Sequence, residues 1–155
     1  MGRIVDVVEQ RIGNKMSRRS RAREVALQVL YEDDMNPGHS VIESDHFVRR
    51  RLKGDASLVE FARSLVAGVR KNRQHLDEVL IQSVENWSLK RMPVTDRNVL
   101  RLGVFEILFT DTPDRVAINE AVELARRFGT QHSAHFVNGV LDRVLKDAGD
   151  KRSGD

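Results

Sequence analysis

Apolar residues recur at intervals of three and four along almost the whole sequence, and this spacing limits the fold more than any other feature. Between residues 22 and 30 they occupy positions i, i+3, i+4, i+7 and i+8, which lie on one face of a helix. The same spacing predicts helices over about 20–35, 41–52, 58–84, 95–109, 118–128 and 133–145. The segment 58–84 is one long helix or two nearly collinear helices that break at 71–73. With only three prolines and no segment that alternates like a strand, the sequence predicts an all-α bundle.

Capping residues and glycines mark the expected helix ends. The candidate N-caps are Ser17 or Ser20, Ser57, Thr95 and Ser133, whose hydroxyls can accept a hydrogen bond from a first-turn N–H. Gly129 fits a C-cap. Gly139 lies inside the last helix, where a glycine predicts close contact with a neighbouring helix.

The segment 95–109 differs from the others because its apolar residues point in nearly every direction, as in a central helix that is covered on most sides. Glu106 falls within this apolar arc. A buried acid normally has a hydrogen-bonding partner, so we interpret Glu106 as structurally paired rather than catalytic.

The sequence offers little material for catalysis. It contains no cysteine, no glycine-rich phosphate loop and no cluster of metal ligands, so we expect no enzyme activity, no cofactor and no metal site. The adjacent acids Asp33–Asp34 and Asp77–Glu78 point about 100° apart on a helix and are interpreted as solvated surface. No apolar run approaches the roughly 18 residues of a membrane span, and we expect a cytoplasmic protein with no membrane partner.

Positive charge is concentrated near the start of the chain, although the formal net charge is only +3. The segment KMSRRSRAR holds five cations without an acid, namely Lys15, Arg18, Arg19, Arg21 and Arg23, and a second cluster contains Arg49, Arg50, Arg51 and Lys53. Arginines around a helix start favour phosphate contacts, and Gln28 and Tyr31 add an amide and a stacking surface. These residues predict RNA binding, with DNA, an acidic protein or a merely solubilising role as alternatives.

Three segments resemble the NusB family. They are RRSRAREVALQVLYE, DRNVLRLGVFEIL and PDRVAINEAVELARRFGTQHSAHFVNGVLD, which together span most of the chain from Ser17 to about Asp147. The resemblance implies two perpendicular three-helix subdomains that share a core. It also implies a transcription antitermination factor that binds boxA-type single-stranded RNA jointly with NusE, a small-subunit ribosomal protein, within the transcription elongation complex of rRNA operons.

The resemblance also implies roles for individual residues. Arg19, Arg21, Arg23, Gln28 and Tyr31 match the family's RNA-facing N-terminal region, which Arg18 adjoins. The expected contacts with the protein partner are Tyr31, Asp96, His132 and Phe136, and Phe136 also lies near the RNA. The chain departs from the family in Ser20, which replaces an arginine of the basic run, and in His132, which replaces an acid that many relatives carry.

The expected organisation has one domain. Residues 1–16 are an extension that we expect to be disordered, 17–147 form the RNA-binding domain with subdomains at about 17–84 and 85–147, and 148–155 are a disordered tail. Two alternatives stay open: an RNA-binding module related to that of rRNA cytosine methyltransferases, and a helical DNA-binding protein. The sequence does not distinguish a monomer from a homodimer.

Overall fold

The computed structural model describes residues 14–84 and 88–153, and the side chains of 18–84 and 88–149. Its elements are α2 (Asn14–Met35), α3 (Val41–Arg51), α4 (Ala56–Ser83), the short 3-10 helix η1 (Leu89–Arg91), α5 (Val94–Phe109), α6 (Asp114–Phe128) and α7 (Ser133–Ser153). The described residues contain no strand, which confirms the all-α prediction. No described helix combines the length and apolar content that crossing a membrane requires.

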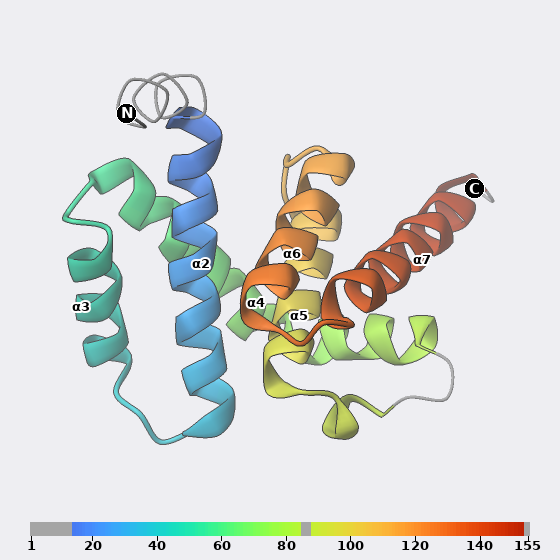
Figure 1. The fold of residues 1–155 in the computed structure, drawn as a ribbon, viewed down its shortest axis with the longest axis horizontal. Helices are drawn as coiled ribbons and strands as arrows, with labels where there is room; N and C mark the ends of the chain where they lie inside the picture. The colour runs from blue at the N-terminus through green and yellow to red at the C-terminus, as the bar shows by residue number, and fades with distance from the viewer. Residues whose placement is uncertain (1–13, 85–87, 154–155) are drawn as a thin grey trace.

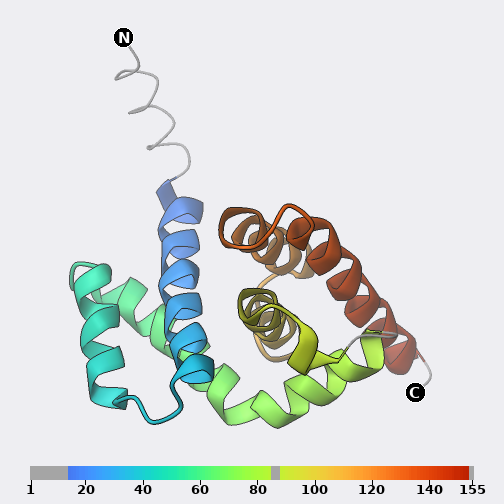
Figure 2. The same ribbon diagram turned by 60° about the horizontal axis from the view of Figure 1, so that its bottom comes forward.

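The helices form two groups of three, as the resemblance implied. In the first group α2 packs on α3 and α4, and in the second α5 packs on α6 and α7. Figure 2 shows α2 from the side and α5 end-on, so the two groups are steeply inclined to each other. Helix α4 joins them because its second half runs under α5 and α7 (Figure 1).

Several helix ends differ from the prediction. Ser17 and Ser20 both lie inside α2, so neither is its N-cap, and α7 continues to Ser153, beyond the expected domain boundary at 147. Asp55, rather than Ser57, caps α4 through its contact with the Leu58 N–H (3.2 Å). Helix α4 is continuous through 71–73, and Gly129 is the C-cap of α6 as expected. The disorder expected of 1–13 and 154–155 lies outside the described residues.

Thr95 does not cap α5, whose N-cap is Pro93 without a side-chain hydrogen bond. The prediction that α5 is the central helix is confirmed, because its residues from 98 to 107 are all buried. The close helix contacts are at Gly68 and Gly103, not at Gly139. A Cβ at Gly68 would lie 2.0 Å from the Phe105 ring, and one at Gly103 would lie 2.7 Å from Leu141. A Cβ at Gly139 would meet nothing within 4 Å, so the expectation for this glycine was wrong.

Candidate nucleic-acid interface

The arginines at the start of α2 fall into two classes. Arg18, Arg19 and Arg21 are exposed, whereas Arg23 is only 3% exposed. The Arg18 guanidinium pairs with Asp55 at the start of α4, and that of Arg19 lies 4.6 Å from the centre of the Phe61 ring. Arg21 has no ion pair with any residue that the structure describes. Three cations are therefore presented at this end of the helix, and two of them, Arg19 and Arg21, have no ion pair among the described residues.

Arg23 points into the protein and pairs with Glu106 of α5. Its Nε lies 3.1 and 3.0 Å from the two carboxylate oxygens, and its Nη2 lies 2.8 Å from Oε1. Thr112 donates a further hydrogen bond to Glu106 (3.2 Å). A guanidinium held by a buried bidentate pair is not free to contact a phosphate. The structure thus removes Arg23 from the predicted RNA-binding residues and confirms the structural pairing expected of Glu106.

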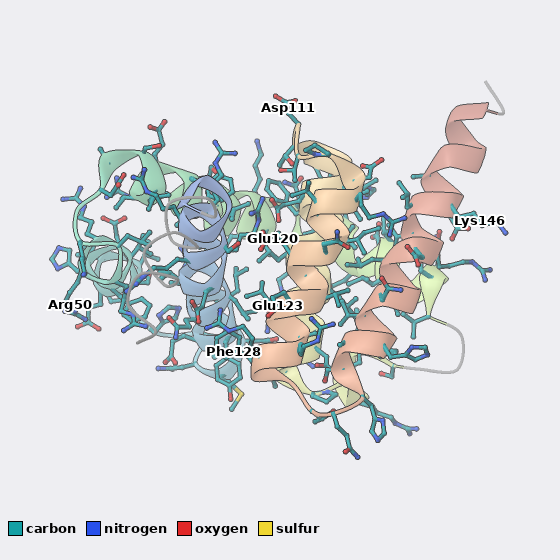
Figure 3. The ribbon with its side chains drawn as sticks, turned by 45° about the horizontal axis from the view of Figure 1, so that its top comes forward. Arg50, Asp111, Glu120, Glu123, Phe128 and Lys146 are labelled. Atoms are coloured by element: carbon teal, nitrogen blue, oxygen red, sulfur yellow. The ribbon has the colours of Figure 1, made fainter. Side chains whose placement is uncertain are left out.

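A groove of about 710 Å³ lies beside these arginines, between α2, the first half of α4 and the loop from α5 to α6. Arg18, Arg19 and Phe61 line one side, and the loop residues 110–113 line the other. In Figure 3, the labels Asp111 and Glu120 mark the side of the groove that is formed by this loop and α6. The Ser20 hydroxyl donates to Glu120 (2.7 and 2.9 Å to its two oxygens), so this departure from the family pattern ties α2 to α6.

Gln28 and Tyr31 lie further along the same helix. The Tyr31 side chain is 40% exposed. Gln28 is partly buried, and its Oε1 has no hydrogen-bonding partner in the described structure. It lines a hollow of about 450 Å³ between α2 and α3, together with Phe47 and His39. Because Arg21, Gln28 and Tyr31 recur at intervals of seven and three, they form one stripe along α2.

A second aromatic side chain, Phe128, is exposed near the C-terminal half of α2. Phe128 continues the apolar spacing of α6, yet it is 40% exposed, and the Arg127 guanidinium lies 5.1 Å from its ring centre. Arg127 also pairs with Glu24 of α2 (2.9 Å), which places the end of α6 beside that helix (Figure 3). Phe128 is the last residue before the Gly129 cap, and side chains at the end of a helix are poorly covered. This position was the sequence signal for its exposure.

The expected partner-contacting residues have different surroundings. His132 is exposed in the loop before α7, and Phe136 is partly buried against the core. Figure 1 shows this loop at the same end of the molecule as the C-terminal half of α2, which carries Tyr31. Asp96 is only 4% exposed, so its carboxylate is not presented at the surface as expected. Burial in the first turn of the central helix explains the difference.

Two acids that were interpreted as solvated instead join the subdomains. Asp34 accepts hydrogen bonds from Arg97 (2.8 Å), Asn98 (3.0 Å) and Arg101 (3.0 Å) of α5. Burial alone would raise the pKa of Asp34, but the hydrogen bonds from Arg97 and Asn98, together with the positive charges of Arg101 and Arg97, outweigh it and the pKa is lowered. Arg101 also pairs with Asp77 of α4 (2.7 Å).

Asp33 belongs to a separate pair of contacts. It accepts from Arg70 of α4 (2.7 and 2.8 Å) and contacts His39 in the loop before α3. Burial again opposes ionisation, and the hydrogen bonds from Arg70 and His39 lower the pKa of this carboxyl. These acids are structural, and within the described residues no group of three His, Cys, Asp or Glu side chains is placed to hold a metal ion.

Comparisons with known proteins agree with this architecture. A family model described as the NusB family matches residues 20–146. The chain is 43% identical to the transcription antitermination protein NusB of Anaeromyxobacter dehalogenans (strain 2CP-1 / ATCC BAA-258) over 139 residues, which covers 90% of the chain and 98% of that protein. It is 44% identical to the protein of the same name in Myxococcus xanthus (strain DK1622), covering 83% of the chain and 95% of that protein.

Solved structures give the same result. The fold is similar to T. maritima NusB with a TM-score of 0.74 and 37% identity, covering 83% of this chain and 90% of that one. It is also similar to a chain in a crystal structure of antitermination factors NusB and NusE in complex with dsRNA. That match has a TM-score of 0.75 and 28% identity and covers 85% of this chain and 98% of the other.

Proposed function

The chain belongs to the NusB family, and we propose that it is a transcription antitermination factor that binds boxA-type single-stranded RNA jointly with NusE. In this proposal it supports processive transcription of rRNA operons as part of the elongation complex. One observation carries the RNA assignment: exposed cations at the start of α2 continue along the same helix into a stripe that offers an amide and an aromatic ring.

The residues of this stripe have complementary chemistry. Arg18, Arg19 and Arg21 supply phosphate contacts, which position RNA without reading its sequence. Gln28 has an unused amide oxygen and Tyr31 an exposed ring, which suit hydrogen bonding to a base edge and stacking on its face. These residues are therefore the proposed source of sequence choice.

NusE is the proposed protein partner because a related structure contains NusB and NusE together with RNA. The end of the molecule that carries Tyr31, Phe128, His132 and Phe136 suits a shared surface, since exposed aromatic rings are enriched in protein interfaces. The proposed activity is binding, not catalysis. The two subdomains, at about 17–84 and 85–147, act in it as one unit.

A binding experiment tests this function. Fluorescence anisotropy at one salt concentration would compare boxA-type single-stranded RNA, the same RNA as a duplex, and duplex DNA, each with and without NusE. We expect single-stranded RNA to bind most tightly and NusE to increase its affinity, because the complex joins two RNA-binding surfaces. Preference for duplex DNA would reject the function, and equal affinity for both RNAs would reject the single-stranded specificity.

A further inference from the structure

The second basic cluster, at the end of α3, has no role in the site described above. Arg50, Arg51 and Lys53 are all exposed, and none of them pairs with an acid in the described part of the chain. Their neighbour Arg49 differs, because it pairs with Asp45 one turn earlier (3.5 Å). Three uncompensated cations thus lie within four residues.

Their position follows from the packing of α3 on α2. The two helices run in opposite directions, and α3 ends near the end of the molecule where α2 begins (Figure 1). The hollow that Gln28 lines places it opposite Phe47. Arg51 lies one turn beyond Phe47 on α3, and Arg21 lies two turns before Gln28 on α2, about 10 Å along the axis. Both arginines therefore lie on the same side of the α2–α3 pair, displaced from Gln28 in the same direction.

The turn after α3 fixes this cluster in place. Lys53 and Gly54 have φ values of 54° and 68°, and the N–H groups of both bond back to the last turn of the helix, at Arg50 (3.2 Å) and Arg49 (2.9 Å). Asp55, two residues after Lys53, pairs with Arg18 of α2. The α3 cluster is therefore linked to Arg18, at the start of α2, through Asp55.

We propose that Arg50, Arg51 and Lys53 form a second phosphate-binding site, which holds the nucleotides flanking the element that Gln28 and Tyr31 read. This inference rests on the proposed function. Residues 49–54 include no aromatic or amide side chain, and their exposed cations suit contacts with phosphates, so we assign this site to the RNA backbone. The order along the surface, from Tyr31 through Gln28 and Arg21 to Arg51, matches a single strand that leaves the reading site over the start of α2.

The experiment compares a boxA-type core RNA with the same RNA extended by uridines at one end or the other. We expect one extension to increase the affinity of the full chain and to steepen its dependence on salt by about 2 in the log–log slope, since each phosphate contact in a single strand contributes roughly 0.7. In Arg50→Ala/Arg51→Ala/Lys53→Asn the core RNA should bind as before, and the gain from the extension should be lost. Asn is used at position 53 because it tolerates the positive φ.

A matched control removes the same charge elsewhere. Lys71→Ala/Lys90→Ala/Lys146→Ala changes exposed cations on α4, η1 and α7 and should keep the gain; Figure 3 shows Lys146 and Arg50 on opposite sides of the molecule. Thermal melting of both variants checks the fold, because cations in a last turn also favour the helix carbonyls. This inference alone would be overturned if the core RNA bound but neither extension increased the affinity, or if both triple variants lost the same share of that increase. No binding of either RNA, with NusE present, would instead overturn the proposed function.

Discussion

Arg21 and Arg23 are two residues apart on α2 but have different roles. Arg23 and Glu106 are almost fully buried, with 4% and 2% of their side chains exposed. Replacing Arg23 with alanine leaves the Glu106 carboxylate buried without its main partner, which costs roughly 3–5 kcal/mol for such pairs. We therefore expect Arg23→Ala to lower the free energy of unfolding by several kcal/mol, measured by urea denaturation.

The matching test of this pair is Arg23→Met/Glu106→Leu, which removes both charges and should recover much of the lost stability. If Arg23→Ala instead unfolded like the wild type and lost only its RNA affinity, Arg23 would have to act at the surface.

Arg21 gives the opposite expectation. Its side chain is exposed and has no ion pair with a described residue, so Arg21→Ala should leave the unfolding curve unchanged. Its RNA affinity should fall, and the salt dependence should flatten by about 0.7 in the log–log slope for one lost phosphate contact. Titrations at several salt concentrations measure this, and an unchanged slope would mean that Arg21 is only solubilising.

The spacing of residues along α2 predicts part of this difference between Arg21 and Arg23. Arg23 lies seven residues before the buried Leu30, and Asp33 lies seven after the buried Ala26, so each shares a face with the core. The basic run suggested a shared surface role for all its arginines. The spacing separates Arg23 only from Arg21, because Arg18 and Arg19 also lie seven residues before buried residues, Val25 and Ala26. The partners could not be predicted, because Glu106 is 83 residues from Arg23 and only the fold brings them together.

At the scale of elements, helix type and order followed from the apolar spacing, whereas close contacts between helices did not. Gly68 of α4 and Phe105 of α5 illustrate this. The phenyl ring occupies the space that a Cβ would need, and it also stacks on Phe109 with 5.8 Å between ring centres. No local pattern shows which glycine faces another helix, and Gly139, the position chosen from sequence, faces open space.

This contact predicts a destabilising small substitution. Gly68→Ala should lower the melting temperature and cost about 1–3 kcal/mol, because the methyl group would displace a buried ring. Gly139→Ala is the control and should be neutral or stabilising by up to about 1 kcal/mol, since alanine favours the helix. In Gly68→Ala/Phe105→Leu the smaller side chain should restore part of the loss. Equal melting of Gly68→Ala and the wild type would mean that α4 and α5 are less closely packed than described.

At the scale of the whole molecule, the two subdomains are joined by charged side chains as well as by the core. Arg97 and Arg101 of the second subdomain both reach Asp34 of the first, and Arg101 also reaches Asp77. The family resemblance implied the two halves, but this connection could not be predicted, because the acids are distant in sequence from their partners. Protonating Asp34 would weaken the charged contacts between the halves without changing either apolar core.

The stability of the chain should therefore fall in acid. The pKa values of Asp33 and Asp34 are lowered in the folded state, so the unfolded chain binds protons at higher pH than the folded one. Their contribution is complete above the unfolded pKa of about 4 and is lost as the pH falls through the folded values. Urea unfolding from about pH 6 to pH 3 should show a falling free energy, with a shallower fall in Asp34→Asn, which is already less stable at neutral pH. Glu60→Gln, which changes an exposed acid without an ion pair among the described residues, should retain the wild-type slope. If Asp34→Asn also retained that slope, the connection between the subdomains would not depend on this charge.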